Sequence, residues 1–185
     1  MVKKILRFNL FFLFLFLFLS SSIYALSAHE VEIITDKDYF PRVHQILKEA
    51  KESIQIIMFE AAYYEKYPDS PSNILIWDLI EAKKRGVRVE VILEIGTWKE
   101  VDKKNINVAK ILSNNGINVR YDPPSITTHA KLIIIDKKIS ILGSNNWTYY
   151  SLHKNNEVSV IITSEKVAFE LEKYFKRLWE NSYGW

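Results

Sequence analysis

The side chains in this sequence that are best suited to chemistry lie close together near its C-terminal third. His129 and Lys131 are two residues apart, so on a β-strand both side chains point to the same face. An imidazole acts as a nucleophile or proton carrier near neutral pH, and a nearby ammonium stabilises negative charge on phosphate oxygens. This pair of residue types therefore predicts attack on a phosphate group.

Three further polar residues follow this pair in the sequence. Ser144 and Asn146 lie in a loop that begins with Gly143, and both offer neutral hydrogen-bond donors to the same phosphate oxygens. We expect the carboxylate of Glu157 to hold the second ring nitrogen of His129. That hydrogen bond would fix the tautomer of the imidazole and raise its basicity.

The order and spacing of these residues resemble a known signature. His-x-Lys-x4-Asp followed by Gly-Ser-x-Asn is similar to the motif of the phospholipase D superfamily, and the spacing to Asn155-Asn156-Glu157 resembles its small nucleases. Large phospholipases and cardiolipin synthases have two copies of the motif, which meet in one active site, whereas this chain has one. A single copy resembles the bacterial Nuc-type endonuclease and the mitochondrial Zucchini-type enzymes. Those enzymes are homodimers that place one motif from each subunit at a two-fold axis.

The resemblance implies ping-pong cleavage of a phosphodiester at a homodimer interface, with no metal or cofactor. His129 of one subunit would attack phosphorus and form a phosphohistidine, while the second His129 protonates the leaving oxygen and then activates water. Lys131 and Asn146 of both subunits would bind the phosphoryl oxygens, with help from Ser144. Asp136, the last residue of the motif, is largely structural in the family and is also typical of a hairpin turn.

Strands and helices are predicted to alternate along the chain and to position these residues. Hydrophobic spacing predicts strands at 31–35, 53–59, 87–93, 117–121, 131–135, 139–142 and 158–163, and helices at 40–50, 73–85, 105–115 and 167–179. We expect one α/β domain, a phospholipase D-like sandwich with a central mixed β-sheet flanked by helices. The sheet should be parallel at first and antiparallel after the hairpin at 131–142.

Residues 1–28 are predicted to be a signal peptide or an N-terminal membrane anchor. Three basic residues precede an unbroken Leu/Phe run at 10–19, and small residues follow it, as in a secretory signal. Residues 8–28 carry no charge and are also long enough to cross a bilayer, so membrane association through them is the other interpretation. In either case residues 29–185, the expected catalytic domain, would be exported to the periplasm or the exterior.

The charge of the chain is distributed unevenly. The formal net charge of +3 equals the contribution of the N-terminal basic residues, so it predicts no substrate. Residues 83–164, which contain the motif, have 13 bases and 7 acids, whereas residues 30–82 have 5 bases and 11 acids. A local positive field attracts a phosphate backbone, and its effect weakens with salt. The absence of cysteine excludes disulfides and Cys-ligated metal sites.

Other residues have both a functional and a structural interpretation. His153 is an alternative proton donor within one chain, although a second copy of His129 is favoured. Glu60 and Glu94 each follow a buried strand, where α/β sites gather, but surface or capping roles explain them equally well. The basic run at 83–88 is typical of a solvated helix end, or tracks phosphates. Aromatic side chains near the motif either stack on nucleobases or pack in the core: Tyr63, Tyr64, Tyr67, Trp77, Trp147, Tyr149 and Tyr150.

The sequence therefore predicts an exported, metal-independent phosphodiesterase, a nonspecific endonuclease that hydrolyses DNA or RNA as a homodimer. The alternative is a phospholipase D or cardiolipin hydrolase acting on lipid phosphodiesters, which would suit a retained N-terminal anchor. A second alternative, from a different class, is a membrane-tethered nucleic-acid-binding module without turnover. The same kind of site serves several substrates, so the motif alone does not choose among them.

Overall fold

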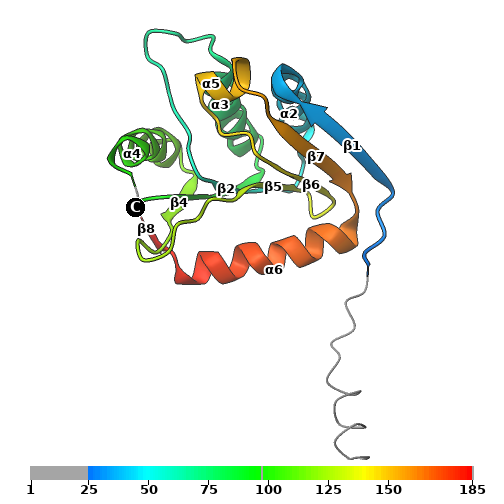
Figure 1. The fold of residues 1–185 in the computed structure, drawn as a ribbon. Helices are drawn as coiled ribbons and strands as arrows, with labels where there is room; N and C mark the ends of the chain where they lie inside the picture. The colour runs from blue at the N-terminus through cyan, green and yellow to red at the C-terminus, as the bar shows by residue number, and fades with distance from the viewer. Residues whose placement is uncertain (1–24, 97, 185) are drawn as a thin grey trace, which may run out of the picture.

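The computed structural model describes residues 25–96 and 98–184, and an eight-stranded sheet runs through the centre of this part of the chain (Figure 1). The order of the strands across the sheet is β1-β7-β6-β5-β2-β3-β4-β8. The strands are β1 (Glu30–Thr35), β2 (Ser53–Met58), β3 (Arg88–Leu93), β4 (Asn118–Tyr121), β5 (Lys131–Ile135), β6 (Ile139–Gly143), β7 (Val158–Thr163) and β8 (Tyr183–Gly184). The signal or anchor predicted for residues 1–28 lies outside the described residues, apart from its last four.

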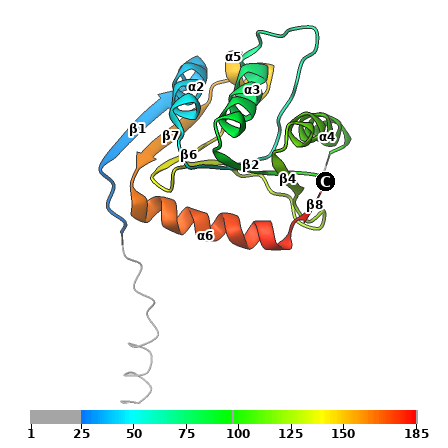
Figure 2. The same ribbon diagram turned by 180° about the vertical axis from the view of Figure 1, so that it is seen from behind.

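Helices cover both faces of the sheet. Figures 1 and 2 show α2, α3 and α4 on one face and α6 alone along the other. The helices are η1 (Asp36–Asp38), α2 (Tyr39–Glu49), α3 (Pro71–Lys84), α4 (Lys99–Asn114), α5 (Tyr149–His153) and α6 (Glu165–Asn181). None of the helices in the described ranges has both the length and the apolar character that crossing a bilayer requires. The layered arrangement confirms the predicted sandwich.

The directions of the strands confirm a mixed sheet and bring several strand ends to one place. Strands β2, β3 and β4 are parallel to one another, whereas β5, β6, β7 and β1 pair in antiparallel fashion. The carboxyl ends of β2, β3, β4 and β6 therefore lie at the same edge as the amino ends of β5 and β7. We call this edge of the sheet the site edge.

Strand β5 is buried on both faces, and this burial determines which way its side chains point. Ile133 and Ile135 pack into the larger core cluster, whereas Leu132 and Ile134 pack with Phe175 of α6. Each buried isoleucine contributes about 2 kcal/mol, so a slip of one residue, which would exchange the two faces, is strongly disfavoured. Because side chains two residues apart share a face, Lys131 lies on the face of Ile133, as predicted.

Three elements differ from the sequence-based expectation. Helix α4 begins at Lys99 rather than at residue 105, because its first turn is charged and only Val101 shows the apolar spacing of a buried face. Helix α5 was not predicted, since it has five residues; the Thr148 hydroxyl caps it by accepting a hydrogen bond from the Ser151 N–H. Strand β8 is a two-residue addition to the sheet beside β4, too short to give a sequence pattern.

Asp136 lies at the edge of the sheet opposite the site edge, in the tight turn between β5 and β6. Asp136 and Lys137 have positive φ values of 50° and 53°, a conformation that aspartate tolerates better than most residues. The Asp136 carboxylate accepts hydrogen bonds from three consecutive backbone N–H groups at the start of β2, at 2.9, 2.7 and 2.9 Å for Lys51, Glu52 and Ser53. Asp136 is therefore a structural tie, and its place among the candidate site residues is corrected.

We predict that Asp136→Ala lowers the free energy of unfolding by about 3 kcal/mol, because the three backbone N–H groups of Lys51, Glu52 and Ser53 lose a charged acceptor. Asp136→Asn should lose less, since asparagine keeps an acceptor oxygen and also tolerates positive φ. Urea unfolding followed by circular dichroism measures both changes. An unchanged midpoint for Asp136→Ala would show that the tie contributes nothing to stability.

Candidate active site

Five of the six residues selected from the sequence lie at the site edge, because strands β5, β6 and β7 begin or end there. They are His129 and Lys131 at the start of β5, Ser144 and Asn146 after β6, and Glu157 just before β7. The Glu157 carboxylate is close enough to Lys131 to influence the pKa of its ammonium. The antiparallel hairpin thus brings together residues that are up to 28 positions apart in the sequence.

A buried ammonium lies directly beside an exposed imidazole. Lys131 is only 7% exposed, and its Nζ donates a hydrogen bond to the His129 carbonyl oxygen at 2.7 Å. The same Nζ lies 3.2 Å from each ring nitrogen of His129. The ring of Phe59, at the end of β2, lies 4.7 Å from this Nζ and 4.5 Å from the imidazole, measured to ring centroids. Hydrogen bonds and the cation–π contact offset part of the cost of burying the charge.

The electrostatic surroundings favour a neutral imidazole. Partial burial lowers the pKa of His129, the Lys131 charge lowers it further, and Glu94 acts in the opposite direction. Burial also lowers the pKa of the Lys131 ammonium, against the effects of Glu157 and Glu60. A lowered pKa leaves His129 with a free lone pair at pH 7, while two carboxylates favour the protonated lysine. The pair combines a nucleophile with a cation that binds anions.

Glu157 is held by neighbours other than the histidine. Its carboxylate accepts hydrogen bonds from the Ser144 hydroxyl, the Ser151 hydroxyl at 2.8 Å and the Asn155 amide at 3.1 Å. These donors orient both carboxylate oxygens. The hydrogen bond that the second ring nitrogen of His129 was expected to donate to Glu157 is thus replaced by bonds from two hydroxyls and an amide, and that expectation is corrected for the single chain. Ser151, which the sequence analysis did not select, belongs to this network.

The end of β6 requires glycine, and the two asparagines that follow it have different hydrogen-bond partners. A Cβ at Gly143 would lie 2.1 Å from the Ser159 hydroxyl oxygen, so no other residue fits without a shift of β7. Asn145 is fully buried and accepts a hydrogen bond from that hydroxyl at 2.7 Å. Asn146 donates its backbone N–H to Ser151, and within the described residues its side-chain oxygen has no hydrogen-bond partner.

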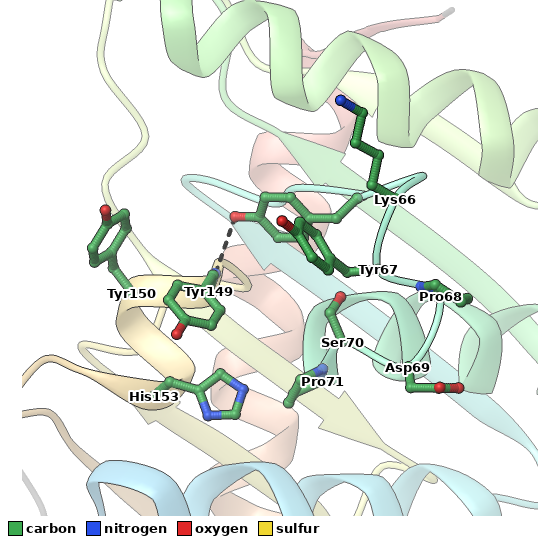
Figure 3. Close-up of a pocket in the computed structure, with 10 residues that line it drawn as sticks. Lys66, Tyr67, Pro68, Asp69, Ser70, Pro71, Tyr149, Tyr150 and His153 are labelled. Atoms are coloured by element: carbon green, nitrogen blue, oxygen red, sulfur yellow. Dashed lines mark hydrogen bonds between the residues drawn. The ribbon is translucent and has the colours of Figure 1, made fainter.

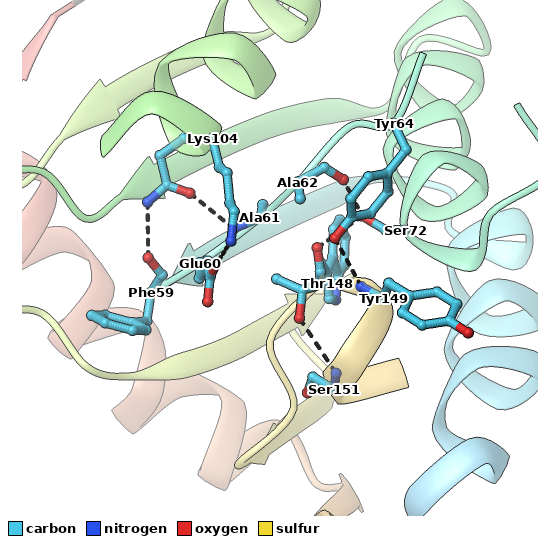
Figure 4. A network of polar contacts seen from close by, with 12 residues as sticks. Phe59, Glu60, Ala61, Ala62, Tyr64, Ser72, Lys104, Thr148, Tyr149 and Ser151 are labelled. Carbon is cyan, nitrogen blue, oxygen red and sulfur yellow. Dashed lines mark hydrogen bonds and ion pairs between the residues drawn. The ribbon is translucent and has the colours of Figure 1, made fainter. Parts of the chain in front are cut away.

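A polar network holds the end of β2 in place beside this site (Figure 4). The buried Asn105 donates to the carbonyl oxygens of Phe59 and Glu94, both at 2.8 Å, and accepts from the Ala61 N–H at 2.8 Å. The Glu60 carboxylate accepts a hydrogen bond from Lys104 at 2.5 Å. These bonds fix the backbone of Phe59, and with it the ring that packs against His129 and Lys131.

Two buried acids lie behind His129: Glu94, for which the sequence left both a site role and a structural role open, and Asp122, which the sequence analysis did not select. Glu94 follows β3 and Asp122 follows β4, and they are 1% and 0% exposed. Both carboxylates accept a hydrogen bond from the Thr128 N–H, at 2.5 Å and 3.2 Å. They therefore hold the backbone immediately before His129. Each acid follows one of two neighbouring parallel strands, and that position is the sequence signal that could have identified the pair.

The two acids lie close enough to interact, and buried neighbouring carboxylates can share one proton. Burial, and next the neighbouring Glu94, raise the pKa of Asp122 to about 7. Below that pH Asp122 holds a proton, and Glu94 raises the pKa of His129, so the charge of the pair acts at the imidazole. Tyr183 of β8 faces the same pair, which contributes to its raised pKa.

The structure shows where the residues with both a functional and a structural interpretation lie. Trp147 is 2% exposed and belongs to the core, where its indole N–H donates to the Tyr39 hydroxyl. Arg85, in the basic run, donates to the carbonyl oxygen of Leu47 at the end of α2, far from the site edge. His153 packs against Tyr149, with ring centroids 5.0 Å apart. Across residues 25–96 and 98–184, no three His, Asp or Glu side chains form a group suited to holding a metal ion.

Comparison with known families agrees with this fold and this site. The family model described as cardiolipin synthase, PLD-like domain, matches residues 43–179. This range covers strands β2 to β7 and all six residues of the predicted motif. The chain therefore belongs to the phospholipase D superfamily, and the predicted resemblance is confirmed.

The names of the relatives refer to different substrates. The mitochondrial cardiolipin hydrolase of Mus musculus is 39% identical over 100 residues, which are 52% of this chain and 42% of that protein. The phospholipase D of Rickettsia typhi is 33% identical over 139 residues, 75% of this chain and 62% of that protein. The chain thus spans less than two thirds of the length of either relative.

Solved structures show the same fold at low identity. The phospholipase D family member Nuc from Salmonella typhimurium has a TM-score of 0.70 and 24% identity, and the match covers 84% of this chain and 99% of that one. NucT from Helicobacter pylori has a TM-score of 0.65 and 18% identity, with 84% and 100% covered. At these identities the similarity defines the fold alone.

Proton sharing in the Glu94–Asp122 pair predicts an unusual pattern of pKa changes at His129. Glu94→Gln or Asp122→Asn alone should change the pKa of His129 little below pH 7, because the remaining acid ionises and keeps one negative charge. The double variant removes that charge and should lower the pKa of His129. Nuclear magnetic resonance titration of the histidine ring signals, assigned with His129→Ala, measures these values. Equal shifts in both single variants and the double variant would contradict a shared proton.

Proposed function

We propose that this chain is a metal-independent phosphodiesterase, a nonspecific endonuclease that hydrolyses DNA or RNA through a phosphohistidine at a homodimer interface. The observation that carries the proposal is the exposed imidazole of His129 placed 3.2 Å from the buried ammonium of Lys131. Membership of the phospholipase D superfamily supports phosphodiester chemistry and leaves the substrate open.

In the first step, the neutral imidazole of His129 attacks phosphorus. A nitrogen–phosphorus bond forms and the bond from phosphorus to one ester oxygen breaks, so the leaving oxygen needs a proton. The negative charge that builds on the other phosphoryl oxygens is stabilised by Lys131, with the Asn146 amide and the Ser144 hydroxyl as further donors. Because Lys131 is already buried and fixed by hydrogen bonds, little reorganisation accompanies this step.

The proton for the leaving oxygen is supplied by a second imidazole. Within the described part of one chain, His129 is the one histidine at the cluster of Lys131, Ser144 and Glu157. His153 instead packs against Tyr149, on the side of α5 that faces away from this cluster. His129 of the partner subunit would enter this step protonated, donate that proton to the leaving oxygen, and then accept a proton from water. That water attacks phosphorus, breaks the nitrogen–phosphorus bond and regenerates the first imidazole. A two-fold pairing of identical surfaces is also the commonest form of oligomer.

Lipid phosphodiesters are the second candidate substrate, because relatives of this chain are named cardiolipin hydrolase and phospholipase D. The chemistry at phosphorus would be the same. We propose that the chain is exported, with residues 1–28 acting as a signal peptide or as an anchor that would place the site near lipid. An activity assay with both substrate classes distinguishes nucleic acid from lipid.

Incubation of the full-length chain in EDTA with plasmid DNA, single-stranded DNA, RNA and phospholipid vesicles tests the substrate and the metal requirement together. We expect nucleic acid to be cleaved, and His129→Ala to lower the rate by roughly 10³-fold or more because the nucleophile is lost. His29→Ala, which removes an exposed histidine outside the cluster, is the matched control and should retain full activity.

Each alternative has its own outcome in this assay. Activity that disappears in EDTA would contradict the metal-independent mechanism. Equal rates for His129→Ala and the unaltered chain would exclude His129 as the nucleophile. Turnover of lipid without cleavage of nucleic acid would favour the second candidate, and binding of nucleic acid without any turnover would favour a non-catalytic binding module.

The shared-site mechanism further predicts that the active form is a dimer. Sedimentation velocity of the full-length chain in detergent, combined with activity measured over the same range of concentrations, should show that activity rises as the dimer forms. Lys131→Ala should still form the dimer but should be inactive, because it removes a phosphate-binding cation and leaves the rest of the site edge in place. Full activity in a strict monomer would contradict a site built from two subunits.

A further inference from the structure

A cleft of about 870 Å³ lies next to the candidate active site, between α5 and the loop that leads into α3. Figure 3 shows Tyr67 of the loop and Tyr149, Tyr150 and His153 of α5 around this cleft. Tyr67 and Tyr150 are 67% and 68% exposed, and Tyr149 is 43% exposed. Large aromatic rings with this much exposure, gathered at one cleft, present π faces to the solvent.

The cleft is held rigidly by bonds between the loop and the helix. The Tyr64 hydroxyl accepts a hydrogen bond from the Tyr149 N–H at 3.0 Å. The buried side chain of Asn73 accepts from the Tyr64 N–H at 2.8 Å and donates to the Tyr64 and Tyr67 carbonyl oxygens at 2.9 and 3.0 Å. The loop backbone is therefore fixed before any ligand binds, which lowers the entropic cost of binding.

The short helix α5 joins the cleft to the candidate active site. Residues 149, 150 and 153 lie on one side of the helix and line the cleft, whereas Ser151 lies on the other. The Ser151 hydroxyl donates to the Glu157 carboxylate at 2.8 Å and accepts from the Asn146 N–H at 2.8 Å. Because a helix with its side chains is about 10 Å across, the cleft begins roughly that distance from the phosphate-binding residues.

The lining of the cleft suits flat rings with polar edges better than an acyl chain. Its ten lining residues include no Leu, Ile, Val, Met or Phe, and the apolar surface comes from tyrosine rings and two prolines. The tyrosine hydroxyls and the His153 ring nitrogens provide hydrogen-bonding groups at the rim. Lys66 and Asp69 contribute opposite charges, so attraction to phosphate is not what distinguishes this surface.

We infer that this cleft is a base-stacking subsite, which binds an unpaired nucleobase of a single-stranded nucleic acid whose phosphate lies at His129 and Lys131. The inference rests on the proposed nuclease function and makes its substrate class more specific. Stacking on aromatic side chains tolerates any base, because every base has a π face, but it requires a base that is not covered by its duplex neighbours. A single strand therefore fits the cleft, and a continuous duplex does not.

The test compares Tyr67→Leu and Tyr150→Leu with Tyr67→Phe and Tyr150→Phe in the full-length chain. Leucine keeps apolar bulk but lacks a π face, whereas phenylalanine keeps the ring. Binding of a fluorescent single-stranded oligonucleotide is measured by anisotropy in a His129→Ala background, so that the probe is not cut. We expect each leucine variant to weaken binding roughly tenfold and each phenylalanine variant to bind like the parent. Phe169→Leu, which removes an exposed ring from α6 on the opposite face of the sheet, should have no effect.

An abasic oligonucleotide of the same length makes the test specific for bases. The abasic oligonucleotide should bind the parent with the same low affinity that the normal oligonucleotide has for the leucine variants. The leucine substitutions should not weaken the binding of the abasic oligonucleotide further. With His129 intact, the leucine variants should hydrolyse bis(p-nitrophenyl) phosphate, which has no bases, at the parental rate. The parent's failure to hydrolyse either this ester or the oligonucleotide would contradict the proposed function alone, because base-dependent binding is measured separately.

Three results would overturn the inference. One is parental affinity for the normal oligonucleotide in the leucine variants. Another is an equal loss of affinity for the abasic and the normal oligonucleotide, since that loss would come from the backbone. The last is a fall in turnover of phosphatidylcholine–cardiolipin vesicles in the phenylalanine and leucine variants alike, with unchanged binding of oligonucleotides, which would assign the cleft to lipid.

Discussion

The burial of one positive charge determines how the rest of the candidate site is built. Lys131 begins a strand whose other residues are all in the core, and its ammonium lies beside the Phe59 ring instead of in water. Such a charge is costly unless it is hydrogen-bonded and faced by negative charge. The His129 carbonyl oxygen, with Glu157 and Glu60 nearby, meets this requirement. An approaching phosphate would also supply negative charge to the Lys131 ammonium. The need to compensate this buried charge therefore favours the binding of an anion at the site.

The sheet places these compensating groups where they are needed. Antiparallel pairing of β5 with β2 and β6 brings Phe59, Lys131 and Ser144 to one edge, although they lie far apart in the chain. Behind this edge, Asn105 ties the end of β2 to that of β3, and the Glu94–Asp122 pair holds the backbone before His129. The exposed imidazole is thus supported from the core side by residues that themselves make no contact with solvent.

Two different surfaces meet at α5. Its Ser151 side belongs to the polar network of Glu157, and its Tyr149 side forms the wall of an aromatic cleft. A helix of five residues links them because Thr148 caps it and the loop tyrosine Tyr64 anchors its first turn. A shift of this helix would disturb both surfaces together, so it would couple the proposed binding of a flanking ring to the proposed reaction at phosphorus.

The sequence by itself determined the family, the sheet and the chemical pair of His129 and Lys131, because strand periodicity and residue spacing are local properties of the chain. It also indicated that Asp136 belongs to a hairpin turn. Only the tertiary structure decided that Asp136 ties the far edge of the sheet, that serines orient Glu157, and that the buried carboxylates of Glu94 and Asp122 meet behind His129. Those facts depend on contacts between strand ends that are distant in sequence, and such contacts exist only after burial of the core has fixed the register of the sheet.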